Sequence, residues 1–314
     1  MSNVQYNISP FNEFSLGSCF DEAYVAVFSG IVGSAYRYLL NRCTYFRYIE
    51  QYFCVSSYDI ELREKIESEY GIRCECCDEQ VDDIIQFALN KLNSGSYVMC
   101  RTSDAVAYNQ RLKRKTQKST SLHWLLIYGY NTETKDFNVL EHMTNVAAQY
   151  EPCLIKFDDL KSAYIAGCKY EEEGATVYSI YREKQKDNML TDNFKLYQRK
   201  CKLIEDKLKL SIESLHRFLH ELMESSHKIE QYDLTVLNEV VRYFEKELWI
   251  QHQAEIEIDK SKELLQKMYL VRTYCMKCLR REDEKTKTVM SNVCLEALEC
   301  AEKWYQSLFG QVGI

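Results

Sequence analysis

Three residues far apart in the sequence, Cys19, His123 and Glu141, have the side chains that nucleophilic catalysis by a cysteine requires. Cys19 follows a small-residue loop and precedes the apolar run 23–28, so we expect it in the first turn of a helix. There the positive end of the helix dipole favours the thiolate, which is the reactive form of cysteine. A histidine that takes the thiol proton and a carboxylate that orients this histidine would complete the site.

The spacing of His123 and Glu141 fits two strands of one hairpin. Residues 122–130 have the composition of a buried strand, residues 131–134 of a turn and residues 136–141 of a second strand. A hairpin centred on Thr132 would place His123 directly opposite Glu141, on the same face of the sheet. The neighbouring His142 and Asp136 are the alternatives to Glu141 as the third residue.

Composition and charge narrow the class of protein. The chain has 314 residues, enough for one large or two ordinary domains, and 46% of them are hydrophobic. A net charge of −7 argues against nonspecific binding of nucleic acid. No basic-then-apolar leader and no apolar run of about 18 residues is present, so we expect a cytoplasmic protein outside the membrane. The 14 cysteines are then expected as free thiols.

Glycine usage divides the chain into two parts. No glycine occurs from Ala175 to Phe309, whereas glycines are spread over the first 174 residues. Residues 1–183 alternate helical patterns (21–40, 78–92, 158–165) with strand patterns (96–101, 122–130, 136–141, 154–157, 175–181), which predicts an α+β domain with an antiparallel sheet. A polar linker over 183–188 leads into residues 184–314, for which the periodicity predicts an all-α bundle of three or four antiparallel helices.

The motif around these residues resembles the papain-like cysteine enzymes of the C39-peptidase-like group. That group has a cysteine opening the first long helix, then a strand of the form His-x-x-x-x-x-Gly-x-Asp/Asn, and then a strand ending in an acid. Cys19, the run from His123 through Gly129 to Asn131, and Glu141 match this pattern. Within the group the chain is most similar to acyltransferases of the butirosin biosynthesis H type, which have a mixed catalytic domain followed by helices.

The resemblance implies a papain-like domain and an acyl transfer reaction. Such enzymes move an acyl group from a carrier-protein thioester to a small-molecule amine in nonribosomal antibiotic assembly, and similar transglutaminase homologues form amides in polythioamides of the closthioamide kind. No cofactor of the enzyme's own is implied, since the phosphopantetheine arm of the carrier is part of the substrate. The helical half would act as a lid that shapes the acceptor pocket, or as a dimerisation domain.

Two positions depart from the pattern of the family. The third residue is usually Asp, and here it is Glu141. Peptidases of the group carry a Gln about six residues before the cysteine as oxyanion donor, and Glu13 stands there, with Asn12 as the neighbouring candidate. The backbone N–H of Cys19 can supply one donor in either case. These departures weaken the peptidase interpretation more than the acyltransferase interpretation.

A basic run precedes His123, and within an acidic protein it is either a solvated loop or a docking surface. Carrier proteins tend to be acidic and their arm bears a phosphate, so basic residues beside the thiol would steer such a partner. An aromatic-rich stretch over residues 36–53 is expected in the core, with some side chains lining an acyl tunnel. The docking residues are Arg111, Lys113, Arg114, Lys115 and Lys118.

Other patterns carry less chemistry. The cluster Cys74, Cys76 and Cys77 lacks a second close cysteine pair in the same half, so we expect no metal site. Two rival functions stay open: a cysteine peptidase or amidase that uses the same three residues, and a catalytically inactive papain-like scaffold that binds a partner.

Overall fold

The computed structural model describes residues 3–13, 16, 18–61, 63–77, 81–103, 122–142, 150–169, 177–183, 192–224, 228–281 and 283–312. The chain forms two compact units. The first unit comprises residues 1–38 and 62–189, and the second comprises residues 39–61 and 190–314. Mixed α+β structure with an antiparallel sheet and a C-terminal helical region is therefore confirmed.

The first unit is built on one antiparallel sheet with the strand order β4-β9-β5-β6-β7-β8, to which β1 adds beside β6. Its strands are β1 (Asn3–Gln5), β4 (Ile72–Cys77), β5 (Ser96–Ser103), β6 (Leu122–Asn131), β7 (Asp136–His142), β8 (Tyr150–Lys156) and β9 (Val177–Arg182). Its helices are α1 (Cys19–Val32), α3 (Arg63–Tyr70), α4 (Ile84–Asn93) and α6 (Phe157–Cys168), while α2 (Tyr36–Asn41) begins in this unit.

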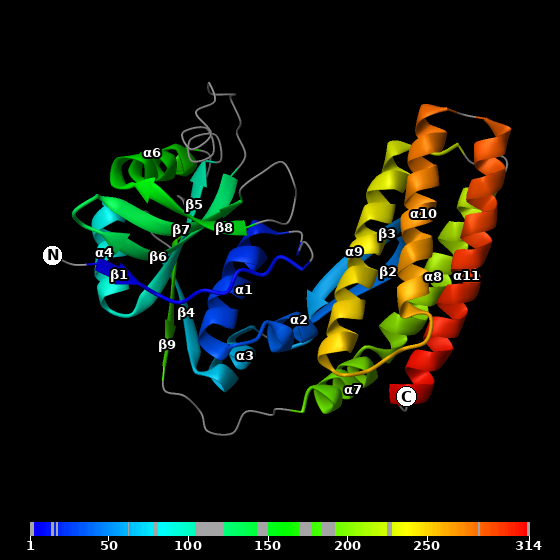
Figure 1. Cartoon of the computed structure of the whole chain (residues 1–314), viewed down its shortest axis with the longest axis horizontal. Coiled ribbons are helices and arrows are strands. Elements are labelled where there is room, and N and C mark those ends of the chain that lie inside the picture. Colours follow the sequence, from blue (N-terminus) through cyan, green and yellow to red (C-terminus); the bar gives the residue numbers. More distant parts are fainter. Residues whose placement is uncertain are drawn as a thin grey trace. The chain divides into compact units, whose positions relative to one another are not determined.

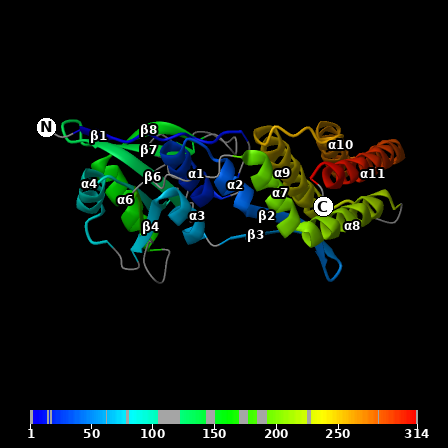
Figure 2. The ribbon, with the colours of Figure 1, turned by 90° about the horizontal axis from the view of Figure 1, so that it is seen from below.

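Helices cover both faces of this sheet (Figure 1). On one face, α1 and α3 pack against alternate residues of the central strands, among them Met99 and Leu126. On the other face, α4 and α6 pack against the residues between them, among them Val98 and Leu125. Figure 2 shows α4 beside α6, with α1 across the strands from them. Strands buried on both faces are expected to be apolar throughout, as β5 and β6 are.

A β-bulge sets the register between β6 and β7. Leu126 pairs with Leu140 and Ile127 with Val139, but Gly129 pairs with Asn138, so Tyr128 is the extra residue. If the pairing of Leu126 with Leu140 is continued along the strands, Glu141 faces Leu125. His123 lies two residues farther along β6, so Glu141 is not directly opposite it. The direct pairing predicted from a hairpin centred on Thr132 is therefore wrong, but the shared face is correct.

The bulge is what keeps the shared face. Asn131 pairs with Asp136 at the turn, and this register extended unbroken would put His123 and Glu141 on opposite faces of the sheet. One extra residue shifts the alternation by one and returns both side chains to the same face.

Helix α1 starts at Cys19 as expected but is shorter than predicted. Ser18 caps it, with its hydroxyl accepting a hydrogen bond from the backbone N–H of Asp21 at 3.5 Å. The single helix predicted over 21–40 is wrong, because Gly33 takes a left-handed φ of 86° and ends α1 before α2 begins. Gly30 lets the extended segment after β1 approach, since a Cβ there would lie 2.5 Å from the carbonyl oxygen of Asn7.

The second unit combines a β-hairpin with helices that lie side by side in Figure 1. The hairpin packs against the helices through aromatic rings, with Phe46 beside Tyr243 and Phe53 stacked on Phe218 at 4.5 Å. The elements are β2 (Arg42–Ile49), β3 (Tyr52–Asp59), α7 (Asn193–Leu203), α8 (Glu205–Met223), α9 (Gln231–Gln253), α10 (Ser261–Arg280) and α11 (Glu284–Val312).

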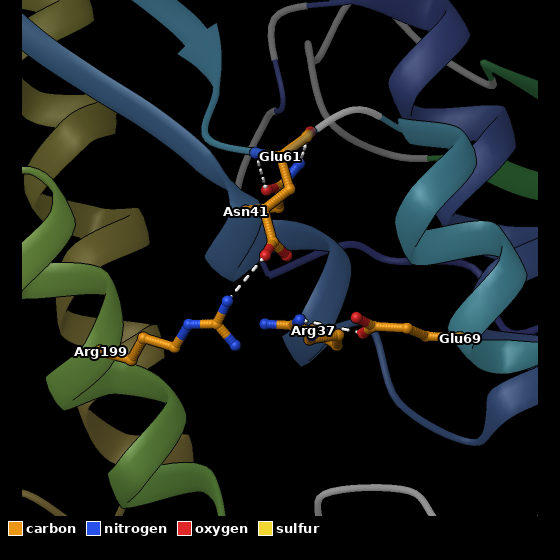
Figure 3. A network of polar contacts seen from close by, with 5 residues as sticks. All are labelled: Arg37, Asn41, Glu61, Glu69 and Arg199. Atoms are coloured by element: carbon orange, nitrogen blue, oxygen red, sulfur yellow. Dashed lines mark hydrogen bonds and ion pairs between the residues drawn. The ribbon is translucent and has the colours of Figure 1, made fainter.

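Polar contacts tie the two ends of this hairpin together (Figure 3). The Asn41 amide donates to the carbonyl of Glu61 at 2.9 Å and accepts from its N–H at 2.7 Å. Arg199 of α7 pairs with the Glu61 carboxylate at 3.0 Å. Figure 3 also draws the ion pair between Arg37 and Glu69 of the first unit, 3.0 Å apart.

The unit boundaries differ from the predicted domains 1–183 and 184–314 in the segment 39–61 and at the junction, which lies after residue 189. Residues 39–61 group with the helices of the second unit, because the hairpin buries its aromatic face there. In the aromatic stretch, Tyr36 of the first unit and Tyr45, Phe46 and Phe53 of the second are buried, as expected, whereas Tyr52 is exposed. Of the predicted linker over 183–188, all residues after 183 lie outside the described residues. Over the described ranges, no helix combines the length and apolarity needed to cross a membrane.

Candidate active site

Cys19 is the first residue of α1 and is half-buried. Burial by itself would raise the pKa of its thiol, but hydrogen bonding and charge from His123 outweigh it. The backbone N–H groups of Trp124 and of Cys19 itself also stabilise the sulfur anion. The pKa of Cys19 is lowered as a result.

The remaining described cysteines behave differently wherever a shift is resolved. Burial raises the pKa of Cys74, Cys100 and Cys201 to about 12 and also raises that of Cys43. Inert buried thiols are the usual case in proteins. Cys19 therefore stands out by its electropositive surroundings.

His123, near the start of β6, connects the sulfur to a carboxylate. Its Nε2 lies 2.9 Å from Oε1 of Glu141, and the two side chains are only 13% and 6% exposed. At this distance the carboxylate both bonds the imidazole and faces its charge. With Nε2 against the carboxylate, Nδ1 is the nitrogen left for the sulfur.

The charges of Cys19 and Glu141 determine the protonation of His123. Burial alone would lower its pKa, but contacts with the Cys19 sulfur and then with Glu141 raise the pKa to about 10. A histidine with a raised pKa beside a cysteine with a lowered one favours the proton on nitrogen. The arrangement therefore favours a thiolate–imidazolium pair, which is the form that a cysteine nucleophile requires.

Tyr150, which is held by Asn12, lies beside the imidazole of His123. The rings of His123 and Tyr150 are nearly parallel, at 17°, with centroids 6.4 Å apart. The Asn12 amide donates to the Tyr150 carbonyl at 3.1 Å and accepts from its N–H at 2.9 Å. Asn12, predicted as an oxyanion donor, thus has its oxygen and one amide hydrogen occupied in holding the start of β8.

Aromatic side chains next to the catalytic candidates in sequence form a half-buried group. Phe20 follows Cys19, Trp124 follows His123, and their rings meet edge to face at 5.3 Å. Tyr178 of β9 contacts both, at 5.5 and 5.4 Å. Arg63 lies over Phe20 and Arg101 over Trp124, each within 6 Å of the ring centre. This group flanks the sulfur because the backbone N–H of Trp124 reaches it.

The alternatives to Glu141 fare differently. Asp136 lies at the other end of β7, where Lys156 pairs with it at 2.8 Å, so it is not the partner of His123. The side chain of His142 lies outside what the structure describes. Glu13 is exposed.

The predicted docking run Arg111, Lys113, Arg114, Lys115 and Lys118 lies outside the described residues. The cysteine cluster falls on β4, and in the described part of the chain no three His, Cys, Asp or Glu side chains are placed to hold a metal ion.

Sequence reasoning missed two contributors to the site. The Trp124 N–H acts through the backbone, which leaves no trace in residue type. Tyr150 belongs to β8, whose start was predicted four residues too late, and the strand-like residues before Pro152 were the available signal.

Comparisons with known proteins add no assignment: no protein-family model matches the sequence, and no curated protein matches it.

Proposed function

We propose that this protein is a papain-like cysteine acyltransferase that moves an acyl group from a carrier-protein thioester to an amine and forms an amide. The observation that carries the proposal is the thiolate–imidazolium pair of Cys19 and His123, backed by Glu141 at 2.9 Å. A cysteine with a lowered pKa beside a histidine with a raised pKa is typical of sites of covalent catalysis.

In the first half of the reaction the Cys19 sulfur attacks the thioester carbonyl carbon. The carbonyl oxygen becomes an anion and accepts a hydrogen bond from the Cys19 N–H at the start of α1. When the intermediate collapses, the carrier sulfur leaves and His123 gives it a proton. The acyl group is then bound to Cys19 as a new thioester.

In the second half an amine attacks this acyl-enzyme. Neutral His123 takes a proton from the amine nitrogen, the carbon–sulfur bond breaks, and Cys19 leaves as a thiolate beside the imidazolium. The amide is released and the starting charges are restored. Glu141 stabilises the imidazolium in both halves without itself taking a proton.

A thioester donor agrees with the modest oxyanion site. Asn12 is occupied by Tyr150, and Glu13 is a poor donor, so the backbone N–H of Cys19 is the donor we assign. Thioesters are more reactive than peptide bonds and need less stabilisation of the oxyanion. This favours acyl transfer over peptide cleavage.

The test is incubation with an acyl thioester on a carrier protein together with a small diamine. Amide product that is lost in Cys19→Ala and in His123→Ala supports the proposal. Free acid alone, with or without the diamine, would instead identify a hydrolase. No product from any thioester, with intact folding, would favour the inactive scaffold.

A further inference from the structure

Glu22 is a buried carboxyl group on α1, three residues after Cys19, that the proposed mechanism does not use. It is 3% exposed and lies at the start of the apolar run of this helix. A carboxyl in such surroundings is costly unless its oxygens find partners. Its retention therefore calls for a physical reason.

The Glu22 side chain points back toward the segment that leads into the helix. Its Oε1 accepts a hydrogen bond from the backbone N–H of Leu16 at 2.6 Å. Its own N–H donates to the carbonyl of Ser18 at 3.0 Å. In an ordinary capping box the third helical residue bonds the cap itself, whereas here the fourth reaches two residues beyond it. The bond to Ser18 is the first backbone bond of α1, whereas the bond to Leu16 depends on the Glu22 side chain.

Only one of the two carboxyl oxygens of Glu22 takes part in the bond to Leu16. Oε2 is buried and has no hydrogen-bond partner among the described residues. The adjacent Asp21 differs, since its carboxylate accepts from the Tyr38 hydroxyl at 2.9 Å. Burial raises the pKa of Glu22 to about 7, opposed by the Leu16 N–H and aided by Asp21. The carboxyl oxygen bound by Leu16 remains an acceptor whether the group is charged or neutral.

We propose that Glu22 is a positioning residue for acyl transfer, which by holding the Leu16 N–H against the first turn of α1 aims the Cys19 N–H at the oxyanion. The inference rests on the proposed function. Glu22 itself contacts neither the sulfur nor the substrate. Its effect passes through the backbone at the start of α1, where a small misplacement of the donor weakens stabilisation of the transition state but leaves the thiolate in place.

Three variants separate this role from a general loss of packing. Glu22→Leu removes the acceptor and keeps the volume, Glu22→Gln keeps the acceptor and removes the charge, and Ser29→Ala is a control change farther along α1. We expect Glu22→Leu to lower kcat about 100-fold with little change in KM, as for a misplaced catalytic group. Glu22→Gln and Ser29→Ala should stay within about fivefold of the parent, the ordinary range for changes that keep the geometry.

Alkylation of Cys19 by iodoacetamide supplies the readout that a merely structural role would not give. In Glu22→Leu the rate should stay within about threefold of the parent, because the His123 contact, which contributes most to the thiolate, is intact and the Cys19 N–H contributes least. An alkylation rate that falls as far as kcat would overturn the proposal, as would a Glu22→Gln variant as poor as Glu22→Leu, or a Glu22→Leu variant with full kcat.

Hydrogen exchange at the Leu16 amide tests the anchor apart from any activity. We expect protection in the parent and in Glu22→Gln, and exchange about tenfold faster or more in Glu22→Leu. Equal exchange in all three proteins would refute the anchor. A parent that shows the anchor but transfers no acyl group would refute the proposed function instead. Should Glu22→Leu fail to fold, Glu22→Ala carries the same expectations.

Discussion

Replacement of Glu141 by glutamine removes the charge that faces His123 and keeps the size of the side chain. The carboxylate oxygen lies 2.9 Å from Nε2, with both side chains largely shielded from water. An opposite charge at such a distance shifts a pKa by about 1–3 units. The pKa of His123 is raised from 6.5 to about 10, and Cys19 contributes to this shift as well. We therefore expect Glu141→Gln to bring the pKa of His123 down by about 1–2 units, toward about 8–9.

The assay is an NMR titration of the imidazole ring of His123 between pH 5 and pH 11. The chain has six histidines, so His123→Gln identifies the signal. Asp136→Asn is the matched control, since it removes a carboxylate from the same strand that pairs with Lys156. Its effect on the His123 titration should stay below about 0.3 units, because a distant charge is screened.

Stability should follow the same shift. Since the folded-state pKa of His123 exceeds its ordinary 6.5, its charged form contributes stability that is fully present below about pH 6.5 and is lost as the pH rises through about 10. In Glu141→Gln this loss should be complete at a pH about 1–2 units lower. A His123 titration that is the same in parent and variant would refute the pairing with Glu141, and a larger shift in Asp136→Asn would assign the role to Asp136.

Three further changes test other parts of the structure. Glu22→Gln should raise the free energy of unfolding by about 2–3 kcal/mol at pH 8 but leave it nearly unchanged at pH 4. The reason is that a carboxyl whose pKa is raised from 4.5 to about 7 destabilises the folded state only once it ionises. Urea unfolding at both pH values measures this, and a gain of equal size at both would contradict it. Asn12→Ala should lower stability by about 1–2 kcal/mol through its two lost bonds to Tyr150, with a modest fall in activity; a loss of kcat of about 100-fold at unchanged stability would instead make Asn12 an oxyanion donor. Lys200→Met should destabilise the second unit by about 3–5 kcal/mol, since it removes the ammonium group that lies 2.9 Å from the buried carboxylate of Glu247. Calorimetry measures the loss, and an unchanged second unit would show that the pair is not buried as described.

The sequence predicted the three residues of the candidate site but not the pairing that brings them together. Residues 124–130 are apolar almost without interruption, because helices cover both faces of β6. Alternation therefore carries no information on register there. The bulge at Tyr128 could not be predicted. The expected pairing still put His123 and Glu141 on the same face, because the turn and the extra residue together shift the register by an even number of positions.

Helices with a clear stripe were predicted well, and elements that depend on distant partners were not. Helices α8 to α11 of the second unit were expected from their three-and-four spacing, whereas α7 was not predicted as a helix of its own. The hairpin of β2 and β3 was missed, because its strands are aromatic on both sides and gain their stability by packing on α8 and α9. Glu22 was overlooked for a related reason: a charged residue at a helix start is common on surfaces, and only the fold shows that it is buried.

The most direct test of the account is to trap the acyl-enzyme. The parent protein is mixed with a small acyl thioester without any amine, quenched in acid, digested and analysed by mass spectrometry. The account predicts one acyl group, on the peptide that contains Cys19, and none in Cys19→Ala or His123→Ala. An acyl group on another of the 14 cysteines, or equal acylation of the His123→Ala protein, would contradict it.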